Sequence, residues 1–100
     1  MAELTTSKIR LWLINDGIYA NKKGFEPLVL CIQRYQRGRL IMPVYESVAN
    51  DLKISSTRVL IKQLQGTICT SKTLRKMEKK SVGAYVAMVR TVLESEGEGK

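Results

Sequence analysis

The chain has no histidine and only two cysteines, Cys31 and Cys69. Histidine is the side chain most used for proton transfer and metal binding near neutral pH. Two thiols alone form neither a zinc site nor a disulfide framework. The sequence also lacks a pair of carboxylates at a spacing that suits acid–base catalysis, and it lacks a glycine-rich phosphate-binding loop. Because acid–base and nucleophilic catalysis have no obvious residues to use, we expect a protein that is not an enzyme and needs no metal or cofactor.

Long hydrophobic runs are also missing. The apolar stretches fall far below the ~20 residues that a membrane span needs. The N-terminal MAELTTSKIR has no apolar segment behind a basic start, so it does not have the pattern of a secretory signal. We therefore expect a cytoplasmic protein with no membrane partner. Cys31 and Cys69 lie in helical apolar patterns, and we expect both to be buried free thiols in the reducing cytoplasm.

Acidic residues are scarce in the middle of the chain. Residues 20–80 hold thirteen Lys or Arg and four Asp or Glu, and the whole chain carries a formal charge of +8. The segment 94–100 is acidic, so the excess positive charge lies in the part that we expect to fold. A small domain with positive charge concentrated in its folded part typically binds a polyanion, and we favour nucleic acid as that polyanion.

Apolar residues recur at helical spacing, and no segment alternates as a strand would. One hundred residues suffice for a single hydrophobic core. We predict an all-α fold of five to six helices around a central helix-turn-helix, in one domain over residues 1–93, followed by a flexible acidic tail over 94–100. The expected helices are 6–16, 25–37, 43–52, 56–69, a short one around Leu74 and Met77, and 83–94.

Each expected helix has an apolar face. In the first two helices the residues of this face, which we expect to be buried, are Ile9, Leu11, Trp12, Leu13, Ile14, Phe25, Leu28, Val29, Cys31, Ile32 and Tyr35. In helices 43–52 and 83–94 they are Val44, Tyr45, Val48, Leu52, Tyr85, Val86, Met88, Val89, Val92 and Leu93. On a wheel of 3.6 residues per turn, one side of helix 56–69 holds Thr57, Leu60, Ile61, Leu64 and Ile68. We expect that side to face the core.

Helices 43–52 and 56–69, joined by a turn of three or four residues, have the arrangement of a helix-turn-helix. In that motif the second helix enters the major groove of double-stranded DNA with its N-terminal residues leading. On its exposed side, the side chains that match base edges are Arg58, Val59, Lys62 and Gln63. We expect phosphate contacts from hydroxyl groups at the start of the helix and from basic residues elsewhere. The hydroxyl residues are Ser55, Ser56 and Thr57, and the basic residues are Lys22, Lys23, Lys72, Arg75 and Lys79.

Three stretches of the sequence together resemble one known family. They are Gly17-Ile18-Tyr19-Ala20 with Lys23-Gly24-Phe25, Tyr45-Glu46-Ser47-Val48-Ala49 with Ser55-Ser56-Thr57-Arg58-Val59, and Tyr85-Val86-Ala87-Met88-Val89. The family is the DNA-binding effector domain of the sporulation response regulator, stage zero sporulation protein A. The resemblance covers about residues 9–93. It implies an all-helical bacterial regulator that binds promoter DNA, as a homodimer or as head-to-tail pairs on tandem sites.

The resemblance also assigns roles to single residues. Arg58 matches an arginine at the start of the family's recognition helix, Thr57 a small hydroxyl residue before it, and Lys23 a lysine before the second helix. The family's following glutamate and arginine are replaced here by Leu60 and Ile61, which leaves open a register in which Lys62 is the second basic residue. The family's phosphorylatable receiver domain has no counterpart in these residues, so we do not expect control by phosphorylation of this chain.

Two other interpretations stay open at this stage. The same fold can serve as a protein-interaction module, for example one that pairs with a full-length sporulation regulator and antagonises it. Helix 56–69 can also be an ordinary amphipathic helix with a solvated face. A DNA reader keeps Arg58 and Lys62 exposed and unpaired, whereas an interaction module buries them in its partner.

Overall fold

The computed structural model describes residues 5–98, with side chains described up to Ser95. Six helices and no strand occur in this part of the chain. They are α1 (Thr6–Asn15), α2 (Phe25–Arg34), α3 (Met42–Asp51), α4 (Thr57–Ile68), α5 (Lys72–Lys76) and α6 (Val82–Glu98). The all-α prediction with five to six helices is therefore confirmed.

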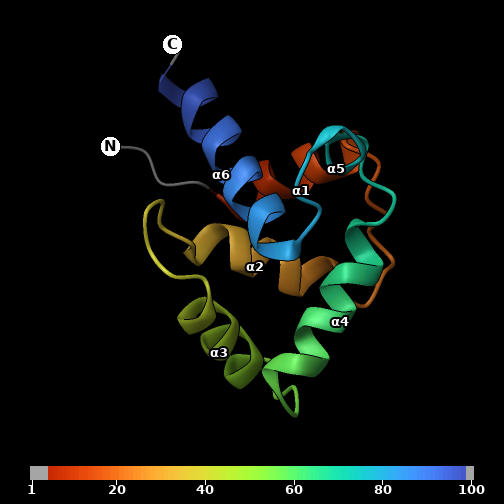
Figure 1. The fold of residues 1–100 in the computed structure, drawn as a ribbon, viewed down its shortest axis with the longest axis vertical. Coiled ribbons are helices and arrows are strands. Elements are labelled where there is room, and N and C mark those ends of the chain that lie inside the picture. The colour runs from red at the N-terminus through yellow and green to blue at the C-terminus, as the bar shows by residue number, and fades with distance from the viewer. Residues whose placement is uncertain (1–4, 99–100) are drawn as a thin grey trace.

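Helix α2 lies at the centre of the molecule and packs against α1, α3, α4 and α6. Helices α3 and α4 form one end, and α1, α5 and much of α6 form the other (Figure 1). The central position of α2 follows from its sequence, because Phe25, Leu28, Val29, Cys31 and Ile32 are all buried around more than one side of the helix.

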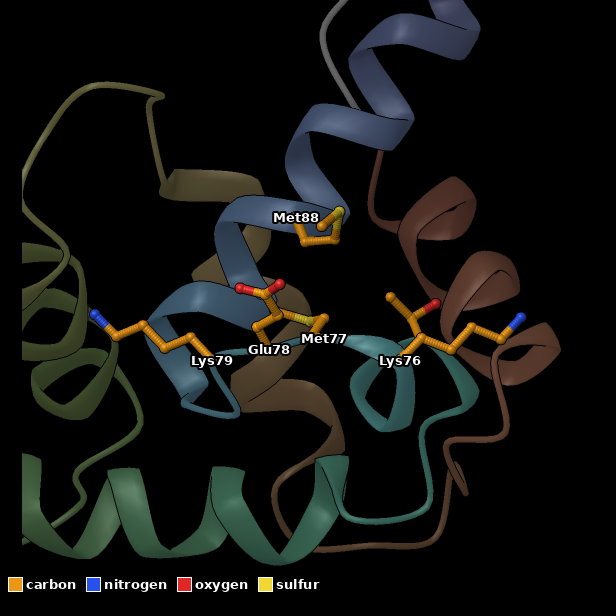
Figure 2. Close-up of a pocket in the computed structure, with 6 residues that line it drawn as sticks. Lys76, Met77, Glu78, Lys79 and Met88 are labelled. Atoms are coloured by element: carbon orange, nitrogen blue, oxygen red, sulfur yellow. The ribbon is translucent and has the colours of Figure 1, made fainter.

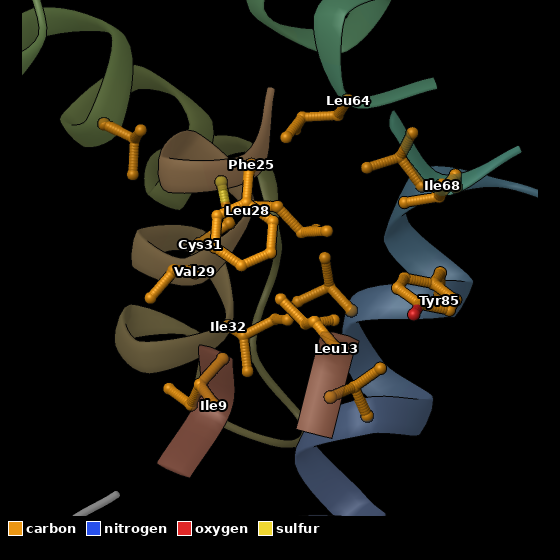
Figure 3. Packing of buried hydrophobic residues seen from close by; sticks show 14 of the residues in the cluster. Ile9, Leu13, Phe25, Leu28, Val29, Cys31, Ile32, Leu64, Ile68 and Tyr85 are labelled. Carbon is orange, nitrogen blue, oxygen red and sulfur yellow. The ribbon is translucent and has the colours of Figure 1, made fainter. Parts of the chain in front are cut away.

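The core gathers apolar side chains from α2 and from the four helices around it. Figure 3 shows Leu13 of α1, Leu64 and Ile68 of α4 and Tyr85 of α6 on the same cluster as the α2 residues. The sequence predicted most of these positions from their helical spacing. Since Leu60 and Leu64 are fully buried, the predicted orientation of α4, with this side towards the core, is confirmed.

A buried carboxylate joins three segments that are far apart in the sequence. Asp16, the C-cap residue that follows α1, accepts hydrogen bonds from the Ser71 hydroxyl, from the N–H and hydroxyl of Thr73 at 3.0 and 2.7 Å, and from the Tyr85 hydroxyl at 2.8 Å. The Asp16 carbonyl also accepts from the Lys72 N–H at 2.8 Å. Burial raises the pKa of Tyr85 above its ordinary value, so this phenol stays a donor. The network fixes the start of α5 against α1 and α6.

Four predicted core positions are wrong, and geometry explains three of them. Leu11 and Ile14 are 64% and 48% exposed. The five apolar residues of α1 cover more of the helix surface than the face that meets α2, and only Ile9 and Leu13 are fully buried. Leu52 is exposed because α3 ends at Asp51 and the chain then turns. Met88 of α6 is 40% exposed.

Most of the predicted helix bounds lie within one residue of the observed ones, but the ends of α2 and α6 differ by more. Helix α2 ends at Arg34, three residues before the predicted end at Arg37, and Tyr35 is only half-buried. The end is stabilised by Arg90 of α6, whose guanidinium donates to the Ile32 and Gln33 carbonyls at 2.9 and 2.7 Å. Helix α6 continues to Glu98, beyond the predicted end at residue 94. Glu94 forms ion pairs with Arg37 and Arg90. Of the predicted tail, residues 99–100 lie outside the described part.

Candidate nucleic-acid interface

The exposed face of α4 carries three of the four side chains predicted to read bases. Arg58, Val59 and Lys62 are exposed, while Gln63 is half-buried at the edge of this face. Gly66 and Cys69 continue the stripe towards the end of the helix. Cys69 was expected to be buried, and that prediction is wrong: it is exposed, because it follows Lys62 and Gly66 at helical spacing on the side away from the core. Cys31 is buried as predicted, and burial raises the pKa of its thiol to about 12.

The connection between α3 and α4 contains a lysine in an unusual backbone conformation. Lys53 has φ +58°, in the left-handed region that favours glycine. Its N–H donates to the Asn50 carbonyl at 3.2 Å, and the Ile54 N–H donates to the Ala49 carbonyl at 2.8 Å. This is the pattern of a Schellman cap, in which glycine is the usual residue at the position of Lys53. The connection spans residues 52–56, and it is longer than the three or four residues predicted because Leu52 and Ser56 serve as caps.

Strained backbone conformations are concentrated at functional sites, so the conformation of Lys53 favours a functional role for its charge. Sequence analysis missed Lys53, although a basic residue two positions before the Ser55–Ser56 pair was a visible signal. The ammonium group lies on the same connection that leads into the start of α4. We therefore add Lys53 to the candidate phosphate contacts.

Lys53→Gly tests this assignment, because it should move stability and DNA binding in opposite directions. Glycine relieves the left-handed strain, so the free energy of unfolding should rise by about 1 kcal/mol in a denaturant titration. The loss of one phosphate contact should make the slope of log K against log salt shallower by about 0.9. Lys53→Arg, which keeps the charge, is the control and should change neither quantity much. A Lys53→Gly protein that is less stable, or that binds DNA with an unchanged slope, would refute the assignment.

The start of α4 has the geometry of an anion-binding helix end. Ser56 is the N-cap, and its hydroxyl oxygen accepts from the Val59 N–H at 3.3 Å. Within the helix, the N–H groups of Thr57 and Arg58 have no acceptor one turn earlier. Ser55 and Ser56 are exposed and Thr57 is half-buried. These groups suit a phosphate beside the Arg58 guanidinium.

Two of the predicted phosphate-binding lysines are held close to α4. Lys22 and Lys23 are exposed in the loop before α2, and the next residue is Gly24. A Cβ on Gly24 would collide with the Thr67 hydroxyl and the Gln63 carbonyl, so this loop lies directly on the second half of α4. Glycine at this position thus brings both lysines beside the proposed reading helix.

The predicted contacts on α5 lie at two different places. The side chain of Lys72 lies near Gly17, where its Cγ would be 3.9 Å from a Cβ, and its backbone N–H is held by Asp16. Lys72 thus lies beside the end of α1, where the loop that carries Lys22 and Lys23 begins. Arg75 is exposed on α5, and its carbonyl accepts from Lys80 at 3.1 Å. Lys79 comes after α5 and lines a groove with Met77 of the same segment and Met88 of α6 (Figure 2).

The charged residues divide into paired and unpaired sets. Within residues 5–95, the ion pairs join Arg10 to Glu26, Arg34 to Asp51, and both Arg37 and Arg90 to Glu94, at 2.6 to 2.7 Å. The Arg10 guanidinium, which hydrogen-bonds to Glu26, lowers the pKa of that carboxyl group. In contrast, no lysine or arginine in residues 53–80 forms an ion pair with a described carboxylate. The cations of α4 and α5 therefore remain available to an external anion.

Comparisons with known proteins give no family or relative for this chain: no protein-family model, no curated protein and no solved structure matches it. In the described part of the chain, no group of three or more His, Cys, Asp or Glu residues is placed to hold a metal ion. None of the helices there combines the length and the apolar character that crossing a membrane requires.

Proposed function

We propose that this domain is a sequence-specific DNA-binding regulator in which α3 and α4 act as a helix-turn-helix and α4 reads the major groove. The observation that carries the proposal is the exposed face of α4, where Arg58 and Lys62 have no described ion-pair partner while four arginines elsewhere are paired. Base reading falls to Arg58, Val59, Lys62 and, from the edge of the face, Gln63. No catalytic step is part of the proposal.

The dimensions of the helix support this use. From Arg58 to Cys69 the exposed stripe is about 16 Å long, at about 1.5 Å per residue. The major groove is about 12 Å wide, so residues at the two ends of the stripe reach opposite phosphate backbones. Lys53 and Ser56 lie at one end, and Lys22, Lys23 and Lys72 at the other. The resemblance of three sequence stretches to the effector domain of stage zero sporulation protein A favours the same function.

Binding to DNA should depend strongly on salt. If five or six basic residues outside α4 contact phosphates, log K should fall with log salt at a slope of roughly −5, at about −0.9 per contact. The candidates are Lys22, Lys23, Lys72, Arg75 and Lys79, with Lys53 now added. Fluorescence anisotropy on a random duplex and on a duplex selected from a pool measures this slope at each salt concentration.

The same titration separates the proposal from its main alternative. A DNA reader prefers the selected duplex at every salt concentration, because base contacts add to the electrostatic attraction. Weak binding that barely responds to salt would instead favour a protein-interaction module, in which the exposed face of α4 pairs with a full-length sporulation regulator.

A further inference from the structure

A second surface of the molecule combines apolar and basic side chains. A groove of about 410 Å³ opens between α5 and α6, lined by Thr73, Lys76, Met77, Glu78, Lys79 and Met88. Met88 points into it from α6 and Met77 from the segment after α5 (Figure 2). Met88 is 40% exposed, although its neighbours Val86 and Val89 on α6 are completely buried. The groove is thus an apolar surface that no described element of the chain covers.

The charges around this groove are arranged in a particular way. The ammonium groups of Lys76 and Lys79 extend in opposite directions from the two methionines, so a positive charge stands at each end of the apolar floor (Figure 2). Segment 72–80 holds Lys72, Arg75, Lys76, Lys79 and Lys80 against a single acidic residue, Glu78. An occupant that fits has apolar side chains in the middle and carboxylates at both ends.

We propose that the α5–α6 groove binds an acidic amphipathic peptide segment of a partner protein. Methionine side chains adapt their shape to different apolar partners and are favoured at peptide-binding surfaces. An amphipathic helix places apolar residues three or four positions apart on one face, which matches a short apolar floor. Nucleic acid fits this surface less well, because a charged phosphate backbone does not bury the apolar side chains of two methionines. The groove lies between α5 and α6, away from the α3–α4 connection (Figure 1), so the peptide leaves the α4 face free.

A labelled peptide panel tests the proposal with the whole chain. The probe is a short fluorescein-labelled helical peptide with two leucines four positions apart and glutamates on both sides. Two matched peptides replace the glutamates by lysine or the leucines by serine. At physiological ionic strength, the acidic peptide should bind at least about tenfold more tightly than either matched peptide, as measured by fluorescence anisotropy.

Variants of the protein then locate the site. Met88→Ser and Lys76→Glu should each weaken binding of the acidic peptide by about tenfold, and Glu78→Gln should strengthen it because a repelling carboxylate is removed. The matched controls are Met42→Ser, a methionine of similar exposure at the start of α3, and Arg39→Glu, a charge reversal in the α2–α3 loop. Both controls should bind the peptide like the unchanged protein.

Three outcomes would overturn the proposal. One is equal binding of the acidic, lysine and serine peptides. The second is a Met88→Ser protein that has the same thermal stability and binds the acidic peptide as tightly as the unchanged protein. The third is complete displacement of the peptide by random duplex DNA, together with weakened DNA binding by Lys76→Glu, which would assign the groove to nucleic acid. The groove shares Lys79 with the candidate phosphate contacts, whereas Lys76, Met77 and Met88 belong to the groove alone. A failure of DNA binding by α4 therefore leaves the peptide measurements unaffected.

Discussion

Replacing Asp16 by alanine is expected to lower the free energy of unfolding by about 2–6 kcal/mol. The carboxylate accepts from Ser71, Thr73 and Tyr85, and both Ser71 and Tyr85 are completely buried. Without Asp16, these two hydroxyls lose their acceptor in an environment closed to water, at about 1–3 kcal/mol each. Because the stability of such a domain is only about 5–15 kcal/mol, this loss is a large part of the total.

Asp51→Ala is the matched control for this prediction. Asp51 is exposed and pairs with Arg34 at 2.6 Å on the surface, so its removal should cost no more than about 1 kcal/mol. Chemical denaturation of both variants measures the difference. If Asp16→Ala is no more damaging than Asp51→Ala, the Asp16 network does not hold α5 in place, and the position of Lys72 and Arg75 needs another explanation.

Replacing Leu64 by alanine is expected to cost about 2–5 kcal/mol of stability, because it leaves a cavity between α4 and α2. Leu64 is fully buried and points at the core beside Phe25 and Leu28 (Figure 3). For a domain of this size, the midpoint of thermal unfolding should fall by at least about 8 °C.

The neighbouring Gln65 provides the control for the Leu64 variant. Gln65 is exposed on the same helix, and Gln65→Ala should change the free energy of unfolding by no more than about 0.5 kcal/mol. An unchanged unfolding temperature for Leu64→Ala would mean that α4 turns a different face to the core. The assignment of Arg58 and Lys62 to the exposed face would then fail as well.

Helical periodicity was enough to predict the fold class and most of the core. It located α2 and α4 well because their buried residues recur every three or four positions. It failed for Leu11 and Ile14, because α1 has more apolar residues than the neighbouring helix can cover. It also failed for Leu52, because α3 ends just before this residue. It failed as well for Cys69, which follows Lys62 and Gly66 on the side of α4 that faces away from the core.

The residues that hold the candidate site together were harder to predict. Asp16, Ser71 and Tyr85 meet only after folding, and nothing in a local pattern marks a carboxylate whose partners are more than fifty residues away. The left-handed conformation of Lys53 was equally hidden, because a lysine gives no sign of positive φ. In contrast, the exposed face of α4 follows directly from the helical wheel, so Arg58 and Lys62 were predicted correctly as exposed residues.

The central claim is that α4 reads bases through Arg58, and one comparison of two variants tests it most directly. The binding constants of Arg58→Ala and Lys72→Ala are measured on the preferred duplex and on a duplex in which the contacted guanine is replaced. Arg58→Ala should fold normally and lose about 1–3 kcal/mol of discrimination between the two duplexes. Lys72→Ala should weaken binding to both about equally, since a phosphate contact carries no sequence information. If Arg58→Ala also weakens both duplexes equally, Arg58 contacts only phosphate, and the claim that it reads a base is wrong.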